Sequence, residues 1–255
     1  MAFMPFVTAG DPDMATTVAL IRELASRGVD LIEVGFPYSD PIADGPVIQA
    51  SYQRALERNF TVDELFAGIA SLQDSDTPIP PLVAMVSFAI VYRTGVETFL
   101  DRAQEVGFSG LIVPDLPGDE AGELADQMRS RNLDLVQLIA PTTPPERAER
   151  ILATCSGFVY CISVAGTTGV RSGLPAELRD QLTWLRTKTD LPLAVGFGIG
   201  KPEHVDILRD TADGVIVGSA IVRQLEAVLD DGKDVQSVLR SIGDFAASMV
   251  TAVRG

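Results

Sequence analysis

Cysteine, histidine and tryptophan are scarce in this chain of 255 residues, which contains two, one and one of them. Cys155 and Cys161 are not spaced as a CxxC pair, and Cys161 lies in the apolar run FVYCISV. We therefore expect two small core thiols of a reducing compartment rather than a disulfide. The single His204 follows Lys-Pro-Glu, which indicates a surface or helix-capping role. This composition argues against a transition-metal site.

Basic residues are also few, with 20 against 35 acidic ones and a net charge of −15. Such a surface repels nucleic acid and anionic membranes, and ordinary solubility is its simplest explanation. No apolar run is long enough to span a membrane, and no signal peptide precedes the first apolar run. We therefore expect a cytoplasmic protein.

Short apolar runs alternate with amphipathic stretches, and the 46% of hydrophobic residues can bury a large core. The apolar runs predict strands at Phe3–Thr8, Leu31–Gly35, Pro81–Met85, Gly110–Pro114, Leu133–Ile139, Phe158–Ile162, Leu193–Phe197 and Gly214–Val217. The stretches between them predict helices at Met14–Arg27, Val47–Glu57, Val62–Leu72, Gly95–Val106, Asp119–Arg131, Pro145–Thr154, Pro175–Thr187 and Pro202–Asp210. Two further helices are expected near the end, at Ala220–Leu229 and Val235–Val253.

The alternation of eight apolar strands with helices is typical of a parallel sheet whose outer face is covered. At this length it favours an α/β fold, a (β/α)8 TIM barrel with extra helices, formed by residues 1–255 as a single domain. A doubly wound open sheet is the alternative. It would normally carry a glycine-rich nucleotide turn after the first strand, where this chain reads TAGDPD.

The segment LIEVGFPYSDPIADGPVIQ, from Leu31 to Gln49, places an acid inside a predicted buried strand. A buried carboxylate is costly unless it has a partner or a task, so Glu33 is the first candidate for catalysis. Side chains alternate along a strand, and Glu33 should therefore point the same way as Gly35. If that way is the barrel interior, desolvation raises the pKa of Glu33 toward the range useful for proton transfer.

A second acid, Asp44, lies in the loop after this strand, where it should stay more solvated and more readily ionised. Two carboxylates in unlike environments suit an acid/base and charge-stabiliser pair. The alternatives are a buried Glu33 paired with a structural arginine, and an Asp44 that merely forms a turn before Gly45.

Glycines gather after the last two predicted strands, at Gly196, Gly198 and Gly200 and again at Gly218 before Ser219. Glycine lets backbone N–H groups approach an anion, and a helix N-terminus adds partial positive charge. Barrels frequently place a phosphate site at these two loops. The alternative is a pair of tight strand-to-helix turns.

The loop Val164–Pro175 is long and rich in small residues, and it contains Thr167, Thr168 and Arg171. It suits a mobile lid, although a plain flexible connection has the same composition. Tyr160 in the preceding strand can offer its hydroxyl to the site or pack in the barrel. Together these residues favour a barrel lyase or isomerase that acts on a small phosphate ester without metal or nucleotide.

At this point the sequence resembles a known family, the tryptophan synthase alpha chain, over nearly its whole length. EVGFPYSDPIADGPVIQ resembles the signature segment of that family, and PFVTAGDPD, FVYCISVAGTTG, GFGIGKPEHV and VIVGSAIV match further segments in the expected order. The resemblance implies retro-aldol cleavage of indole-3-glycerol phosphate to indole and glyceraldehyde 3-phosphate.

The resemblance also implies roles for the catalytic residues. Glu33 would protonate indole C3 and help to take the hydroxyl proton, and Asp44 would accept the indole N–H bond. Tyr160 would support Glu33 and the glycerol end of the substrate. The implied substrate-binding residues are Phe6, Ile112 and Phe197 in the indole slot, Thr168 and Gly169 in the lid, and Gly169, Gly198, Gly218 and Ser219 at the phosphate.

The family's partner is a beta chain that carries pyridoxal phosphate (PLP), receives indole through a tunnel and joins it to serine. The resemblance therefore implies an α2β2 assembly, with no cofactor in this chain itself. The loop after the third strand, which faces the beta chain in the family, has Ala89-Ile90 where members often have asparagine. The lid sequence VAGTTG also departs from the common pattern.

Family members usually have a helix before the first strand, whereas this sequence starts within the strand at Met1. We expect this N-terminal helix to be absent, with the barrel floor covered differently, unless the true start lies upstream. Two other functions stay open. One is another phosphate-binding barrel lyase or isomerase, which would want a catalytic lysine or metal-binding histidines. The other is a non-catalytic activator of the beta chain.

Overall fold

Eight parallel strands close into a barrel in the computed structural model, which describes all residues except 42–43, 75–76, 163–174, 197, 231 and 233. Neighbouring strands pair in sequence order, and β8 closes the barrel against β1. This arrangement confirms the predicted (β/α)8 fold. The strands are β1 Ala2–Thr8, β2 Ile32–Gly35, β3 Leu82–Met85, β4 Phe108–Ile112, β5 Asp134–Ile139, β6 Val159–Ile162, β7 Leu193–Gly196 and β8 Gly214–Val217.

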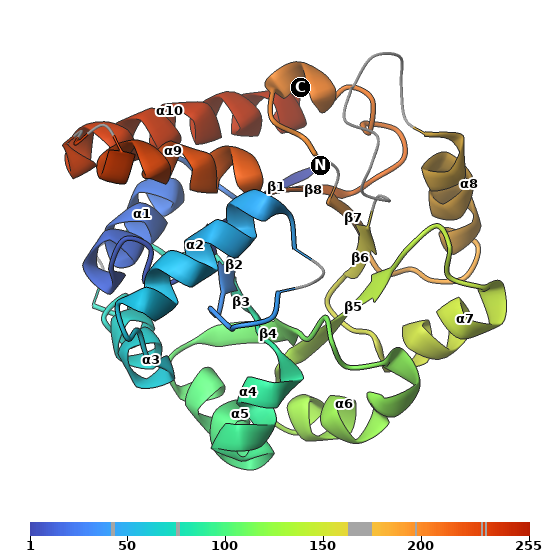
Figure 1. The fold of residues 1–255 in the computed structure, drawn as a ribbon. Coiled ribbons are helices and arrows are strands. Elements are labelled where there is room, and N and C mark those ends of the chain that lie inside the picture. The colour runs from blue at the N-terminus through green and yellow to red at the C-terminus, as the bar shows by residue number, and fades with distance from the viewer. Residues whose placement is uncertain (42–43, 75–76, 163–174, 197, 231, 233) are drawn as a thin grey trace.

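Helices surround the barrel (Figure 1), and α9 and α10 both pack against β1. Among the described residues, none of them is both long and apolar enough to cross a membrane. The α-helices are α1 Met14–Ser26, α2 Pro46–Glu57, α3 Val62–Ala70, α4 Phe88–Thr94, α5 Val96–Glu105, α6 Gly122–Arg129, α7 Pro145–Thr154, α8 Ala176–Leu185, α9 Ser219–Asp230 and α10 Val235–Arg254, and the short 3-10 helices are η1 Gly118–Glu120 and η2 Pro202–His204.

Three helical predictions needed correction. The helix α4 was missed, and it is separated from α5 by Gly95, whose φ of 90° favours glycine and ends the first helix. The helix expected from Asp119 begins instead as η1, before α6 starts at Gly122. The helix expected at Pro202–Asp210 is only the short η2, whose N-cap Lys201 makes no side-chain capping bond.

Alternation along the strands separates two cores. Val7, Val34 and Val195 face outward and join the large cluster beneath the helices. The opposite face of the sheet forms a second cluster inside the barrel, with buried members on six strands and on α2 and α9. Residues of this inner face include Met4, Phe6, Val83, Met85, Ile112, Val136, Phe158, Ala194 and Ile216.

Polar contacts attach α2 to the segment around β1. The guanidinium of Arg54 donates to both carboxylate oxygens of Asp11, at 3.0 and 2.7 Å, and Asp11 is almost wholly buried. The hydroxyls of Thr8 and Ser51 lie 2.7 Å apart in a buried hydrogen bond. Bidentate arginine–carboxylate pairs fix orientation as well as distance. They therefore hold the second half of α2 against β1 and the segment that follows it.

Candidate active site

Glu33 points into the barrel. It is paired in register with Phe6 on β1 and Val83 on β3, both of which belong to the inner cluster. Its side chain is fully buried, and neither carboxylate oxygen has a hydrogen-bond partner among the described residues. Within the described part of the chain, no arginine pairs with this carboxylate, contrary to the alternative of a structural ion pair. Glu33 is therefore a carboxyl group held in an apolar interior.

This environment changes the acidity of Glu33. Burial raises its pKa from 4.5 to about 8, and the negative charge of Asp44 contributes in the same direction. Desolvation acts this way because the ionised carboxylate loses hydration that the apolar walls cannot replace. A carboxyl group with this pKa exists in both forms near neutral pH and can give or take a proton.

Asp44 lies beyond β2, at the mouth of the barrel, and is only half-buried. Burial raises its pKa from 3.8 to about 6, while the hydroxyl of Tyr38, which donates to it at 3.5 Å, acts in the opposite direction. Asp44 also takes part in a turn, since its N–H donates to the carbonyl of Pro41 at 3.1 Å. Asp44 thus forms the expected turn, and it is the more acidic of the two carboxyl groups, while its role as a charge stabiliser stays a prediction.

Three other predicted residues line the same interior. Phe6, Ile112 and Tyr160 all belong to or pack against the inner cluster that surrounds Glu33. Tyr160 is partly exposed, and a Cβ added at Gly196 would lie only 2.7 Å from its hydroxyl. Desolvation, with Glu33 and Asp44 nearby, raises the pKa of Tyr160 well above its ordinary value. Its hydroxyl therefore stays protonated and can serve as a donor.

The predicted phosphate residues lie where β7 and β8 end. Gly218 directly precedes α9, and Ser219 is its exposed first residue. Within the described part of the chain, no hydrogen bond engages the backbone N–H of Ser219 or Ala220. Gly198 has a φ of 35°, in the region that favours glycine. Free amides at a helix N-terminus can bind an anion, and the positive φ of Gly198 is the backbone conformation of the neighbouring loop.

Thr168, Gly169 and Phe197 lie outside the described residues, as does most of the predicted lid. Among the residues that are described, no group of three or more histidine, cysteine or acidic side chains could hold a metal ion. His204 accepts a 3.4 Å hydrogen bond from the N–H of Gly200, which fits the predicted capping role more than a catalytic one.

Two aromatic residues beside Asp44 were not predicted from the sequence. Tyr38 donates to Asp44, and its ring lies 5.6 Å from that of Tyr52, measured between centroids. Tyr52 is buried on α2 and joins the inner cluster together with Ile48. The spacing of Ile48 and Tyr52, one helical turn apart and just after the acidic loop, was the signal that could have identified them.

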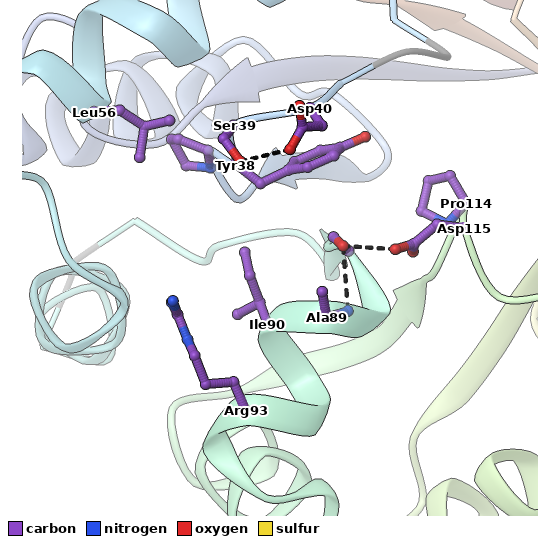
Figure 2. A pocket seen from close by; sticks show the side chains of 11 residues that line it. Tyr38, Ser39, Asp40, Leu56, Ala89, Ile90, Arg93, Pro114 and Asp115 are labelled. Carbon is purple, nitrogen blue, oxygen red and sulfur yellow. Dashed lines mark hydrogen bonds between the residues drawn. The ribbon is translucent and has the colours of Figure 1, made fainter.

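A groove opens beside the site, where the loops after β2, β3 and β4 meet (Figure 2). It is lined by Tyr38 and Asp40 on one side and by Ala89, Ile90 and Arg93 of α4 on the other. A further wall is Asp115, whose carboxylate accepts bonds from the hydroxyl of Ser87 at 2.6 Å and the N–H of Phe88 at 2.7 Å. This surface contains the Ala89-Ile90 departure.

The fold and site define a class of protein, a (β/α)8-barrel enzyme with two carboxyl groups at the carboxyl-terminal mouth of the barrel. Comparison with known proteins identifies the family within this class. The family model of the tryptophan synthase alpha chain matches residues 1–250, and this chain belongs to that family.

Relatives agree over nearly the full chain. The tryptophan synthase alpha chain of Rhodopirellula baltica is 45% identical, with 99% of this chain and 93% of the relative covered. That of Alkaliphilus metalliredigens is 44% identical over 94% of this chain and 90% of the relative. Among solved structures, the tryptophan synthase α2β2 complex of Pyrococcus furiosus matches with a TM-score of 0.87 at 36% identity, covering 98% of each chain.

The acidity of Glu33 predicts a pH dependence of stability. Because its pKa is about 8 in the folded chain against an ordinary 4.5, folding takes up a proton between these values. The free energy of unfolding should therefore fall as the pH rises from 4.5 to 8. Glu33→Gln should remove this contribution. Between these pH values, the free energy of unfolding of the variant should rise relative to that of the wild type by on the order of a few kcal/mol.

Urea unfolding at several pH values measures this effect. Glu177→Gln is the matched control, because Glu177 is exposed on α8 and should leave the wild-type slope unchanged. Asp44 contributes in the same sense at lower pH and remains in every variant. Parallel stability curves for the wild type and Glu33→Gln would contradict the buried, ionisable state of Glu33.

Proposed function

We propose that this chain cleaves indole-3-glycerol phosphate to indole and glyceraldehyde 3-phosphate, as the alpha subunit of tryptophan synthase. The observation that carries the proposal is the fully buried, unpartnered carboxyl of Glu33 in a barrel of this family. The reaction breaks the bond between indole C3 and the glycerol chain. It needs a proton delivered to an electron-rich carbon and a proton removed from a hydroxyl.

Glu33 has the properties required for both transfers. With a pKa of about 8, a protonated fraction can protonate indole C3 and the resulting carboxylate can take the hydroxyl proton. Asp44, with a pKa of about 6, is mostly ionised at neutral pH. It is suited to accept the indole N–H bond and to stabilise the positive charge that C3 protonation places on the ring. Tyr160 can hold the glycerol end by donating its hydroxyl.

The indole end of the substrate matches the apolar interior of the barrel, and its phosphate end matches the amides at the strand ends. Phe6 and Ile112 offer apolar surface to the indole ring, and Phe197 is proposed to complete this slot. The phosphate is proposed to bind at Gly198, Gly218 and Ser219. None of these three residues is basic. Peptide dipoles must therefore attract the phosphate, despite the net charge of −15 on the chain. Thr168 and Gly169 are proposed to close over the site.

A beta chain is the proposed partner, in an α2β2 assembly, because the matching Pyrococcus furiosus protein is described as such a complex. We place its docking surface over the groove between Asp40, Ala89 and Asp115. This groove adjoins Tyr38, which contacts Asp44, so that a partner bound there could influence the site.

PLP is expected in the beta chain and no cofactor in this chain. We also propose a cytoplasmic location and a single domain for residues 1–255.

The alternative functions have less support. Another phosphate-binding barrel enzyme would want a catalytic lysine at a strand end. Lys188 instead pairs with Glu149 at 2.7 Å, and Lys201 is exposed. A non-catalytic activator would have no use for the costly burial of Glu33, which the chain nevertheless retains.

Indole release from indole-3-glycerol phosphate tests the function. The purified chain should release indole both with and without a beta chain, and Glu33→Gln should lower kcat by about a thousandfold, the usual scale of general acid–base catalysis. Glu177→Gln, an exposed control, should retain wild-type activity. An inactive wild type under both conditions would rule out the enzyme, and an active Glu33→Gln would rule out the role of Glu33.

Ser219→Asp tests the phosphate site. A carboxylate at the start of α9 should repel the substrate phosphate and raise KM by about tenfold or more. The control is Ser248→Asp, which adds the same charge at an exposed position of α10. Steady-state kinetics would separate the two. Equal KM values for both variants would place the phosphate elsewhere.

Ala89→Glu tests the docking surface. Ala89 is exposed at the groove, and a charged side chain there should weaken binding of the beta chain by about tenfold through desolvation. The activity of the isolated alpha chain should not change. Calorimetric titration with a beta chain measures the affinity. Unchanged binding would show that the partner docks on another surface.

A further inference from the structure

Tyr52 contains a buried hydroxyl that the reaction described above does not use. Its side chain is 1% exposed, and the hydroxyl has no hydrogen-bond partner in the described part of the chain. The same is true of both carboxylate oxygens of Glu33. A buried polar group without a partner destabilises the fold, so an unpartnered donor beside an unpartnered acid calls for an explanation.

The position of this hydroxyl is known from its neighbours. A Cβ added at Gly35 would lie 2.6 Å from the Tyr52 oxygen, so the absence of a side chain at Gly35 makes room for it. Gly35 follows Glu33 by two residues on the inner face of β2, one step nearer the mouth. The Tyr52 hydroxyl therefore lies beside Gly35, on the side of Glu33 that faces the mouth of the barrel.

The surroundings of Tyr52 keep it a donor. Its pKa is well above the ordinary value because of burial and of the neighbouring Asp44, Tyr38, Glu33 and Tyr160. Its ring packs against Tyr38, with the centroids 5.6 Å apart, and the inner cluster holds it on the barrel side. Packing thus fixes the ring, while the hydroxyl stays without a hydrogen-bond partner among the described residues.

We propose that Tyr52 is a substrate-binding residue, whose hydroxyl donates a hydrogen bond to the substrate hydroxyl oxygen that loses its proton to Glu33. This inference rests on the proposed function. A substrate hydroxyl is both donor and acceptor, so one such group satisfies both orphans by donating to Glu33 and accepting from Tyr52.

The chemistry gives this bond a purpose. When the bond from the glycerol carbon to indole C3 breaks, its electron pair stays on indole, and C3 keeps the proton it received from Glu33. The hydroxyl proton passes to the Glu33 carboxylate, and the carbon–oxygen bond becomes the carbonyl of the aldehyde. Negative charge grows on that oxygen during the transfer. A fixed donor aimed at it stabilises the transition state more than the bound substrate.

Tyr52→Phe isolates the hydroxyl, because it keeps the ring and its packing. Turnover of indole-3-glycerol phosphate by the isolated chain should fall about tenfold in kcat/KM, the effect of losing one hydrogen bond. Thermal unfolding of the ligand-free variant should occur at the same or a higher temperature, because an unpaired buried hydroxyl has been removed. The control is Tyr92→Phe, which removes the hydroxyl of a tyrosine that is 74% exposed and should change neither quantity.

A binding measurement keeps the test independent of turnover. In the Glu33→Gln background, Tyr52→Phe should weaken the affinity for indole-3-glycerol phosphate several-fold. It should leave unchanged the affinity for indole-3-propanol phosphate, which lacks the glycerol hydroxyls. If the wild type binds the substrate but does not cleave it, the proposed function fails while this measurement still decides the role of Tyr52. Equal losses for both ligands, a loss for neither, or a lower unfolding temperature would overturn the proposal.

Discussion

Desolvation of one carboxyl group is the constraint on which the site depends. Glu33 lies fully buried among apolar side chains, and no described group neutralises it. Burying an ionised acid has a large cost, and the folded chain avoids much of it because the group stays mostly protonated below its pKa of about 8. The same environment that destabilises the barrel near neutral pH therefore creates an acid able to work there. Stability and activity make opposite demands on this position.

The rest of the mouth is built around that group. Arg54 and Asp11 hold α2, which follows Asp44 in the chain, against the segment after β1. Asp44 is less buried and more acidic than Glu33, and its charge raises the pKa of Glu33 further. The two acids therefore reach unlike protonation states from unlike burial. That difference allows one to move protons while the other holds a positive charge.

The proposed phosphate end solves a different electrostatic problem. A chain of net charge −15 must attract an anion at one place. The amides at the start of α9 provide local partial positive charge at Ser219, which is exposed. Local dipoles act over a few ångströms and are stronger there than distant surface charges, which salt screens. Acidic composition is thus compatible with a substrate that carries phosphate.

Sequence alone determined the strand alternation, and with it the barrel and the shared direction of Glu33 and Gly35, because these follow from local periodicity. Only the tertiary structure decided that this direction is the barrel interior. The sequence also marked Asp44 and the glycines at the strand ends. Tertiary structure alone decided what surrounds them: the absence of a partner for Glu33, and the hydroxyl of Tyr52 above Gly35. Helix α4 and the shortened η2 were likewise missed, since caps and neighbours set helix ends. Burial and orphaned hydrogen bonds depend on contacts between segments far apart in the chain, which periodicity does not encode.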